Sequence, residues 1–159
     1  MVVLGIDPGT HCGWCVLPLS GETLSGVWEL KGSRYEGGGM RFLRLRQQLS
    51  ELLDRVNPDV VAYEEVHGHK GVDAAHIYGG IIAVLTMECE RRNVPYMGVG
   101  VGIAKKRATG KGNAKKEHMI ASAQKHWPGW SGCDNEADAR WVAVCGMDEM
   151  TKNAREVLG

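Results

Sequence analysis

Four carboxylates stand at places in this sequence where burial would leave them uncompensated, and their positions constrain how the chain can fold. Asp7 directly follows the apolar residues 2–6, Glu64 ends a second apolar run, and Asp138 interrupts a late helical stretch, with Asp134 one turn before it. A buried ionised carboxylate is unfavourable unless it is paired or bound to a metal, and neighbouring carboxylates raise one another's pKa. Mg²⁺ and Mn²⁺ prefer oxygen ligands. The pattern therefore predicts a divalent-metal site, and the alternative is four separate caps, turns or ion pairs.

The length and composition of the chain are those of one globular domain, expected to span residues 1–159. The sequence has no obvious bilayer-spanning run and no signal-like start, so we expect a cytoplasmic protein without a membrane partner. Its five cysteines are spread along the chain, which predicts free thiols. Cys12 and Cys15 have the spacing of a metal motif, but strand positions three apart point to opposite faces, which argues against zinc.

The formal net charge is zero, but the positive charges are unevenly distributed. One short segment concentrates them and is interleaved with glycines, so it predicts a flexible basic loop that lies along a phosphate backbone. The alternative is a solvated loop without a partner. The basic residues of this segment are Lys105, Lys106, Arg107, Lys111, Lys115 and Lys116.

Hydrophobic periodicity predicts three strands, a helix, a strand, a helix, a strand and two helices, an α/β order with a mixed five-stranded sheet. The polar tail after residue 147 is expected to fray. The expected strands are residues 2–6, 12–19, 23–30, 59–64 and 95–101, and the expected helices are residues 42–56, 72–92, 113–127 and 133–147.

The helix expected at residues 72–92 is apolar nearly all round in its first half. Packing one face on a sheet would leave another apolar face exposed, and a homodimer contact would cover it. Gly79 and Gly80 would let a partner backbone approach, although they can equally mark a bend. On this reading Ile81→Glu or Gly80→Arg should give a monomer.

Three motifs in this order resemble the RuvC-like Holliday junction resolvases: residues 5–10 (GIDPGT), residues 62–66 (AYEEV) and residues 136–139 (EADA). The resemblance covers nearly the whole chain and implies a ribonuclease H-like α/β fold, with a five-stranded mixed sheet flanked by helices. It also implies that Asp7, Glu64 and Asp138 bind catalytic Mg²⁺ or Mn²⁺, two ions per site.

The fourth metal ligand is less clear from the sequence. In the family it commonly lies three residues before the aspartate that Asp138 matches, and that position is Asn135 here, flanked by Asp134 and Glu136. Positions three and four apart share a helix face, so Asp134 or Asn135 can face the metal beside Asp138, whereas Glu136 points away. We favour Asp134.

The resemblance also implies DNA contacts. It matches Lys105 and the pair Lys115 and Lys116 to lysines near the scissile phosphate, and it matches His67 to an aromatic residue that wedges into the junction centre. Lysine supplies a point charge that suits phosphate without reading base identity. For His67 the alternative is an exposed loop residue.

These observations predict a metal-dependent, structure-selective endodeoxyribonuclease that resolves four-way DNA junctions by paired phosphodiester hydrolysis. A two-fold homodimer would present two identical sites to the junction. The short chain resembles compact phage members, so its place would be the cytoplasm of a bacterial or phage-infected cell. The alternatives are a nuclease for branched DNA such as forks and flaps, or a decayed junction-binding protein. Residues 5–10 also resemble the first phosphate loop of actin-like ATPases, but those enzymes need two such domains.

Overall fold

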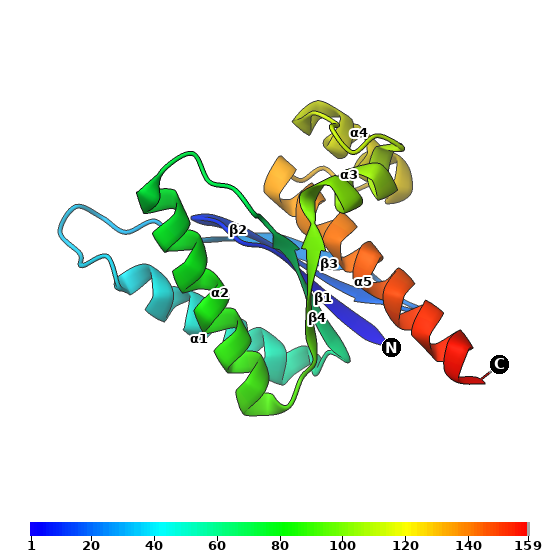
Figure 1. The fold of residues 1–159 in the computed structure, drawn as a ribbon, viewed down its shortest axis with the longest axis horizontal. Coiled ribbons are helices and arrows are strands. Elements are labelled where there is room, and N and C mark those ends of the chain that lie inside the picture. Colours follow the sequence, from blue (N-terminus) through cyan, green and yellow to red (C-terminus); the bar gives the residue numbers. More distant parts are fainter. Residues whose placement is uncertain (159) are drawn as a thin grey trace.

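Five strands form one mixed sheet in the order β3-β2-β1-β4-β5, and helices cover both of its faces (Figure 1). This computed structural model describes residues 1–158. The strands are β1 (Val2–Asp7), β2 (His11–Pro18), β3 (Leu24–Glu29), β4 (Val60–Glu65) and β5 (Tyr96–Gly100). The helices are α1 (Met40–Val56), α2 (Val72–Arg92), α3 (Val101–Thr109), α4 (Lys116–His126) and α5 (Asp134–Leu158).

The first three strands form an antiparallel meander, whereas β4 and β5 run parallel to β1. β1 is thus the central strand, and it pairs with β2 on one side and β4 on the other. Parallel neighbours need a crossover, which α1 supplies between β3 and β4 and α2 supplies between β4 and β5. The predicted order of the first seven elements is confirmed.

Alternation along the strands divides the core into two layers. Leu4, Ile6 and Val61 join the cluster that includes the buried residues of α1 and α2, whereas Val3 and Ala62 join the cluster that includes α5. Figure 1 shows α1 and α2 together on one side of the sheet and the long α5 on the other. Since side chains alternate along a strand, every second residue of β1 and β4 faces α5.

Helix α5 lies unusually close to the sheet because glycines face it. A Cβ atom at Gly5 would lie 2.3 Å from the carbonyl oxygen of Ala139, and one at Gly13 would lie 2.0 Å from that of Asn135. No side chain fits at either point. The first turns of α5 are thus held directly against β1 and β2.

Two expectations about secondary structure are wrong. Residues 101–109 form a helix rather than a flexible basic loop, because Ala104 is buried against the core beneath α5, and only residues 110–115 are irregular. The tail does not fray after residue 147 but continues α5 to Leu158, since Met147 and Met150 still pack on the cluster beneath the sheet.

The cysteine expectations are confirmed. All five cysteines are free, and Cys12 and Cys15 are buried in different core clusters on opposite faces of the sheet. Their separation leaves no zinc site at this motif. Burial raises the pKa of each of these two thiols to about 12, so both are inert hydrophobic residues.

Helix α2 differs from expectation in two ways. Ile81 is fully buried in the monomer, and a Cβ atom at Gly80 would lie 2.4 Å from the Phe42 ring of α1, so neither residue is available to a partner. Substituting them would damage the core, and they are the wrong test of a dimer. By length and composition α2 is also able to cross a membrane, with a mean hydropathy of 1.2 over its most apolar stretch, contrary to our reading of the sequence.

Candidate active site

Two carboxylates of the candidate site come from adjacent parallel strands. The register pairs Ile6 with Tyr63, so Asp7 and Glu64 are the next residues of β1 and β4. They lie side by side and in phase with Val3 and Ala62, which face α5. The sheet thereby presents both carboxylates toward the same helix.

The other two carboxylates lie on the first turns of α5. Asp134 and Asp138 are four residues apart and share a helix face. Glu136 points elsewhere, because its Oε1 accepts hydrogen bonds from Ser25 Oγ at 2.5 Å and Trp130 Nε1 at 2.7 Å. The expectation that Glu136 points away from the site is thus confirmed, and these bonds tie the start of α5 to β3.

The four carboxylates interact electrostatically. Burial raises the pKa of Asp7 well above its usual range, and the charges of Glu64, Asp138 and Asp134 raise it further. Burial and then Asp138 raise the pKa of Glu64 to about 7, against the opposing effect of Lys105. Burial and then Asp134 raise the pKa of Asp138 to about 6. Such coupled, buried acids are typical of a functional site.

Lys116, the first residue of α4, pairs with Asp134 Oδ2 across the site. This hydrogen bond lowers the pKa of Asp134 and keeps its carboxylate ionised. The Lys116 side chain is 78% exposed, so its ammonium group can leave Asp134 and remain hydrated. A basic residue of the predicted DNA surface therefore lies at the carboxylate cluster.

The carboxylates suit a hard cation. In residues 1–158, no group of three or more His, Cys, Asp or Glu side chains is arranged so that it could hold a metal ion. Within the same residues, however, Asp138 Oδ1 is buried and has no hydrogen-bond partner, and such an orphaned oxygen needs an explanation. A divalent ion would satisfy Asp138 Oδ1 and relieve the repulsion around Asp7. The residues fit Mg²⁺ or Mn²⁺ as a ligand set of oxygens.

The predicted basic residues do not all lie together. Lys105 lies close enough to lower the pKa values of Glu64 and Asp138. Arg107 points toward the later part of α5, where its Nε donates to Asp148 Oδ2 at 2.6 Å. Lys106, Lys111 and Lys115 are exposed.

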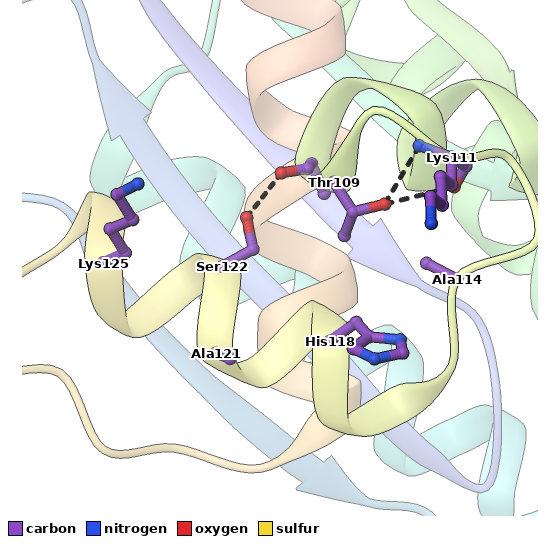
Figure 2. Close-up of a pocket in the computed structure, with 8 residues that line it drawn as sticks. Thr109, Lys111, Ala114, His118, Ala121, Ser122 and Lys125 are labelled. Carbon is purple, nitrogen blue, oxygen red and sulfur yellow. Dashed lines mark hydrogen bonds between the residues drawn. The ribbon is translucent and has the colours of Figure 1, made fainter.

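A cavity of about 430 Å³ between α3 and α4 adds two basic residues that sequence reasoning missed. Figure 2 shows Lys111, His118 and Lys125 around this cavity. Ser122 Oγ donates to the carbonyl oxygen of Ala108 at 2.5 Å and joins the two helices. The spacing of His118 and Lys125, seven residues apart on α4, places them on one helix face. The sequence does not show that Lys111 lies beside that face.

The loop after β4 carries the predicted wedge residue. His67 is 80% exposed, and its Nε2 lies 3.5 Å from Glu65 Oε2. Sequence reasoning missed Tyr78 of α2, whose hydroxyl donates to the Glu64 carbonyl and accepts from the Val66 amide, both at 3.1 Å. Nothing in the sequence marks Tyr78, because its role depends on how α2 packs on β4.

A family profile described as crossover junction endodeoxyribonuclease RuvC matches residues 3–145. Curated relatives with that name include one from Nitratidesulfovibrio vulgaris, 29% identical over 94% of this chain and 92% of the relative. Another, from Cereibacter sphaeroides, is 31% identical over 98% of this chain and 94% of the relative.

Solved structures agree with the sequence comparison. Thermus thermophilus RuvC in complex with a Holliday junction substrate superposes with a TM-score of 0.78 at 27% identity, over 91% of each chain. The yeast mitochondrial Holliday junction resolvase Ydc2 superposes with a TM-score of 0.62 at 18% identity, over 89% of this chain and 75% of that one, which is a likeness of fold.

Proposed function

This chain belongs to the RuvC family of crossover junction endodeoxyribonucleases, and we propose that Asp7, Glu64, Asp134 and Asp138 form its catalytic metal centre. The fold is ribonuclease H-like and the activity is that of a hydrolase that cuts DNA at four-way junctions. The observation that carries the metal proposal is the meeting of four coupled carboxylates from β1, β4 and α5, with one buried oxygen unpaired among the described residues.

The chemistry of the site follows from its charges. Bound divalent cations, two per site in this proposal, make water nucleophilic and stabilise the leaving oxygen. Asp7 on the central strand, Glu64 on β4, and Asp134 with Asp138 on α5 would hold these ions. Lys105, which acts on Glu64 and Asp138, is placed to position the phosphate that is cut.

We propose that the DNA surface extends from the carboxylates across α3 and α4. Lysine and histidine side chains neutralise backbone phosphates without reading sequence, and they make binding dependent on salt. Arg107 also belongs to this surface, and we expect a smaller contribution from it because it is paired with Asp148. The other residues are Lys105, Lys106, Lys111, Lys115 and Lys116, with His67 at the junction centre and the additional pair His118 and Lys125.

We propose that the exposed face of α2 forms a homodimer. Val72 is 70% exposed and Met87 is 45% exposed, and Gly79 and Ala83 leave a shallow surface between them. No described atom lies within 4 Å of where a Gly79 Cβ would be, so a partner can approach there. The same exposed apolar face gives α2 its membrane-like composition, and a dimer would cover it. Two sites related by a two-fold axis match the paired cuts that resolution requires.

This proposal places the protein in the cytoplasm of a bacterial or phage-infected cell, where branched DNA is its partner. Resolution of four-way junctions is the main reading of its activity. Trimming of forks and flaps remains the alternative activity, and junction binding without cleavage is the alternative if the site has decayed at Asn135.

The deciding experiment compares cleavage of a labelled synthetic four-way junction with cleavage of matched duplex, flap and fork DNA. Wild type and Asp7→Asn are tested in Mg²⁺, in Mn²⁺ and in EDTA. We expect paired nicks on the junction that need the metal and disappear in the variant, while gel-shift binding persists. Equal cutting of all branched forms would favour the debranching enzyme, and binding without cutting by wild type would favour the decayed site.

A further inference from the structure

A second cavity, of about 420 Å³, adjoins the carboxylate cluster without containing any of its members. One wall is the turn Pro8-Gly9-Thr10, which directly follows Asp7, and the opposite wall is the first half of α2. Val66, two residues after Glu64, closes one end. The cavity is thus lined by residues that closely follow Asp7 on one strand and Glu64 on the other.

The lining of this cavity is largely apolar and includes a pair of rings. Ala74, Ile77 and Ile81 of α2 contribute aliphatic surface. The His69 ring packs on the Tyr78 ring with their centroids 4.7 Å apart and their planes tilted by 44°. His69 is half-buried by this contact although the residues on either side of it are exposed. The loop after β4 is therefore anchored on α2 at the edge of the cavity.

The aromatic wall is fixed to the active site. The Tyr78 hydroxyl bonds to the backbone on both sides of Glu65, at the Glu64 carbonyl and the Val66 amide. Both hydroxyl bonds hold the end of β4 against α2, so the ring cannot turn away without releasing this strand end. A planar ligand against Tyr78 would meet a rigid surface.

We propose that this cavity binds one unstacked nucleobase of the strand that is cut, close to the scissile phosphate. This inference rests on the proposed function and names how that site selects its substrate. The lining has no carboxylate, lysine or arginine, which suits an uncharged planar group rather than a phosphate. Thr10 and His69 supply the polar atoms that a base edge requires.

Junction geometry favours such a ligand. Bases at a branch point have lost a stacking neighbour, so they leave the helix at lower cost than bases in duplex DNA. Stacking on an aromatic ring compensates part of that cost and tolerates every base, whereas contacts at the base edge discriminate. The cavity therefore makes cleavage depend on the presence of a base at one position near the cut, and on its identity.

The first test is an abasic scan of the strand cut in a four-way junction. We expect wild type to cleave the intact junction and to lose about tenfold in rate when the base is missing at one position near the scissile phosphate. 2-Aminopurine at that position should change fluorescence when Asp7→Asn binds the junction without cutting it. A flat scan with normal cleavage of the intact junction would overturn the subsite alone, whereas no cleavage of any junction would overturn the proposed function.

The second test changes the cavity. Ala74→Phe places a ring at its rim, and Ala74→Ser at the same exposed position is the matched control. His69→Ala removes one ring of the aromatic pair, and His69→Phe restores a ring at that position. We expect Ala74→Phe and His69→Ala to abolish the dependence on the scanned base and the fluorescence change, with unchanged dimer mass, while Ala74→Ser and His69→Phe retain both. Identical scans for all four variants would overturn the assignment of the base to this cavity.

Discussion

At the scale of single residues, burial disfavours the ionised form of three carboxylates in the site, whereas a lysine stabilises the ionised form of the fourth. Asp7, Glu64 and Asp138 have raised pKa values because they are buried together, whereas Asp134 has a lowered pKa because Lys116 donates to it. A divalent cation brings the positive charge that the first three lack. In the metal-free protein, ionisation of these carboxylates should therefore lower the stability of the folded state.

The pH dependence of stability is the first prediction. The pKa of Glu64 rises from its usual 4.5 to about 7 in the folded protein, so the folded state binds more protons than the unfolded state between these values. The stability of the metal-free protein should accordingly fall as pH rises through this window. The melting temperature in EDTA should drop by several degrees from about pH 5 to pH 7, since ~1 kcal/mol shifts the melting temperature of a domain of this size by about 2–4 °C.

Glu64→Gln supplies the control for this prediction. Glutamine keeps the shape and cannot ionise, so the drop in melting temperature over the same window should become smaller. Added Mg²⁺ should reduce the drop in wild type by favouring the ionised carboxylates. An equal drop in wild type and Glu64→Gln would show that Glu64 does not titrate in this window.

The neighbouring lysines give a second prediction, because Lys116 pairs with Asp134 and Lys115 has no such contact among the described side chains. In EDTA, Lys115→Ala should reduce the salt slope of junction binding by roughly 0.9 per phosphate lost. Lys116→Ala should change it less, since Asp134 holds that ammonium. Gel shifts at several salt concentrations measure both slopes, and equal losses would mean that Lys116 already contacts DNA in the metal-free protein.

At the scale of elements, the position of α5 controls the site. Gly5 and Gly13 let the helix backbone touch β1 and β2, which brings Asp134 and Asp138 to the strand end that carries Asp7. A bulkier residue at either glycine would move the helix and its two carboxylates together. We therefore expect metal binding to depend on these two glycines, which are not ligands themselves.

Gly13→Ala tests this dependence. Its Cβ would lie 2.0 Å from the Asn135 carbonyl oxygen, and backbone cannot give way as a flexible side chain does. We expect a loss of about 1–3 kcal/mol in the free energy of unfolding, as for other overpacked sites. Calorimetric Mg²⁺ or Mn²⁺ affinity should also fall. Gly38→Ala, at a position with no described atom within 4 Å, is the control, and normal metal affinity in a folded Gly13→Ala protein would refute the argument.

At the scale of the whole molecule, the proposed DNA surface and the proposed dimer surface lie on different parts of the protein. Helices α3 and α4 lie together near the start of α5 (Figure 1). Asp134 and Asp138 belong to that start of α5, and the proposed basic residues come from α3, α4 and the segment between them. Helix α2 packs on the other side of the sheet from α5, so the proposed dimer would leave the active site open. The arrangement is consistent with one site for each of the two strands cut.

The dimer yields the last prediction. Gly79→Arg adds charge and bulk to the exposed face of α2 without a clash inside the monomer. We expect a folded monomer by light scattering that nicks junctions singly instead of in pairs. Leu19→Arg, at a residue that is 65% exposed on another part of the surface, should stay dimeric. A dimeric Gly79→Arg protein would move the interface away from this face.

The sequence by itself determined the strands, most of the helices and three acids of the candidate site, because these depend on local signals. Apolar runs, helical periodicity and acids at their ends are readable without knowing what packs on what. The same signals predicted that Glu136 would turn away from Asp138, since helix geometry alone decides this.

Only the tertiary structure decided the rest, since it depends on contacts between distant segments. Residues 101–109 are helical because Ala104 is buried beneath α5, and α5 continues to Leu158 because its later residues pack on the sheet. Arg107 donates to Asp148, forty-one residues away in the sequence. Gly80 and Ile81 turned inward because α1 packs on them, and Tyr78 reached Glu64 for the same kind of reason. Contacts between distant segments cannot be read from the composition of the chain or from the spacing of its residues.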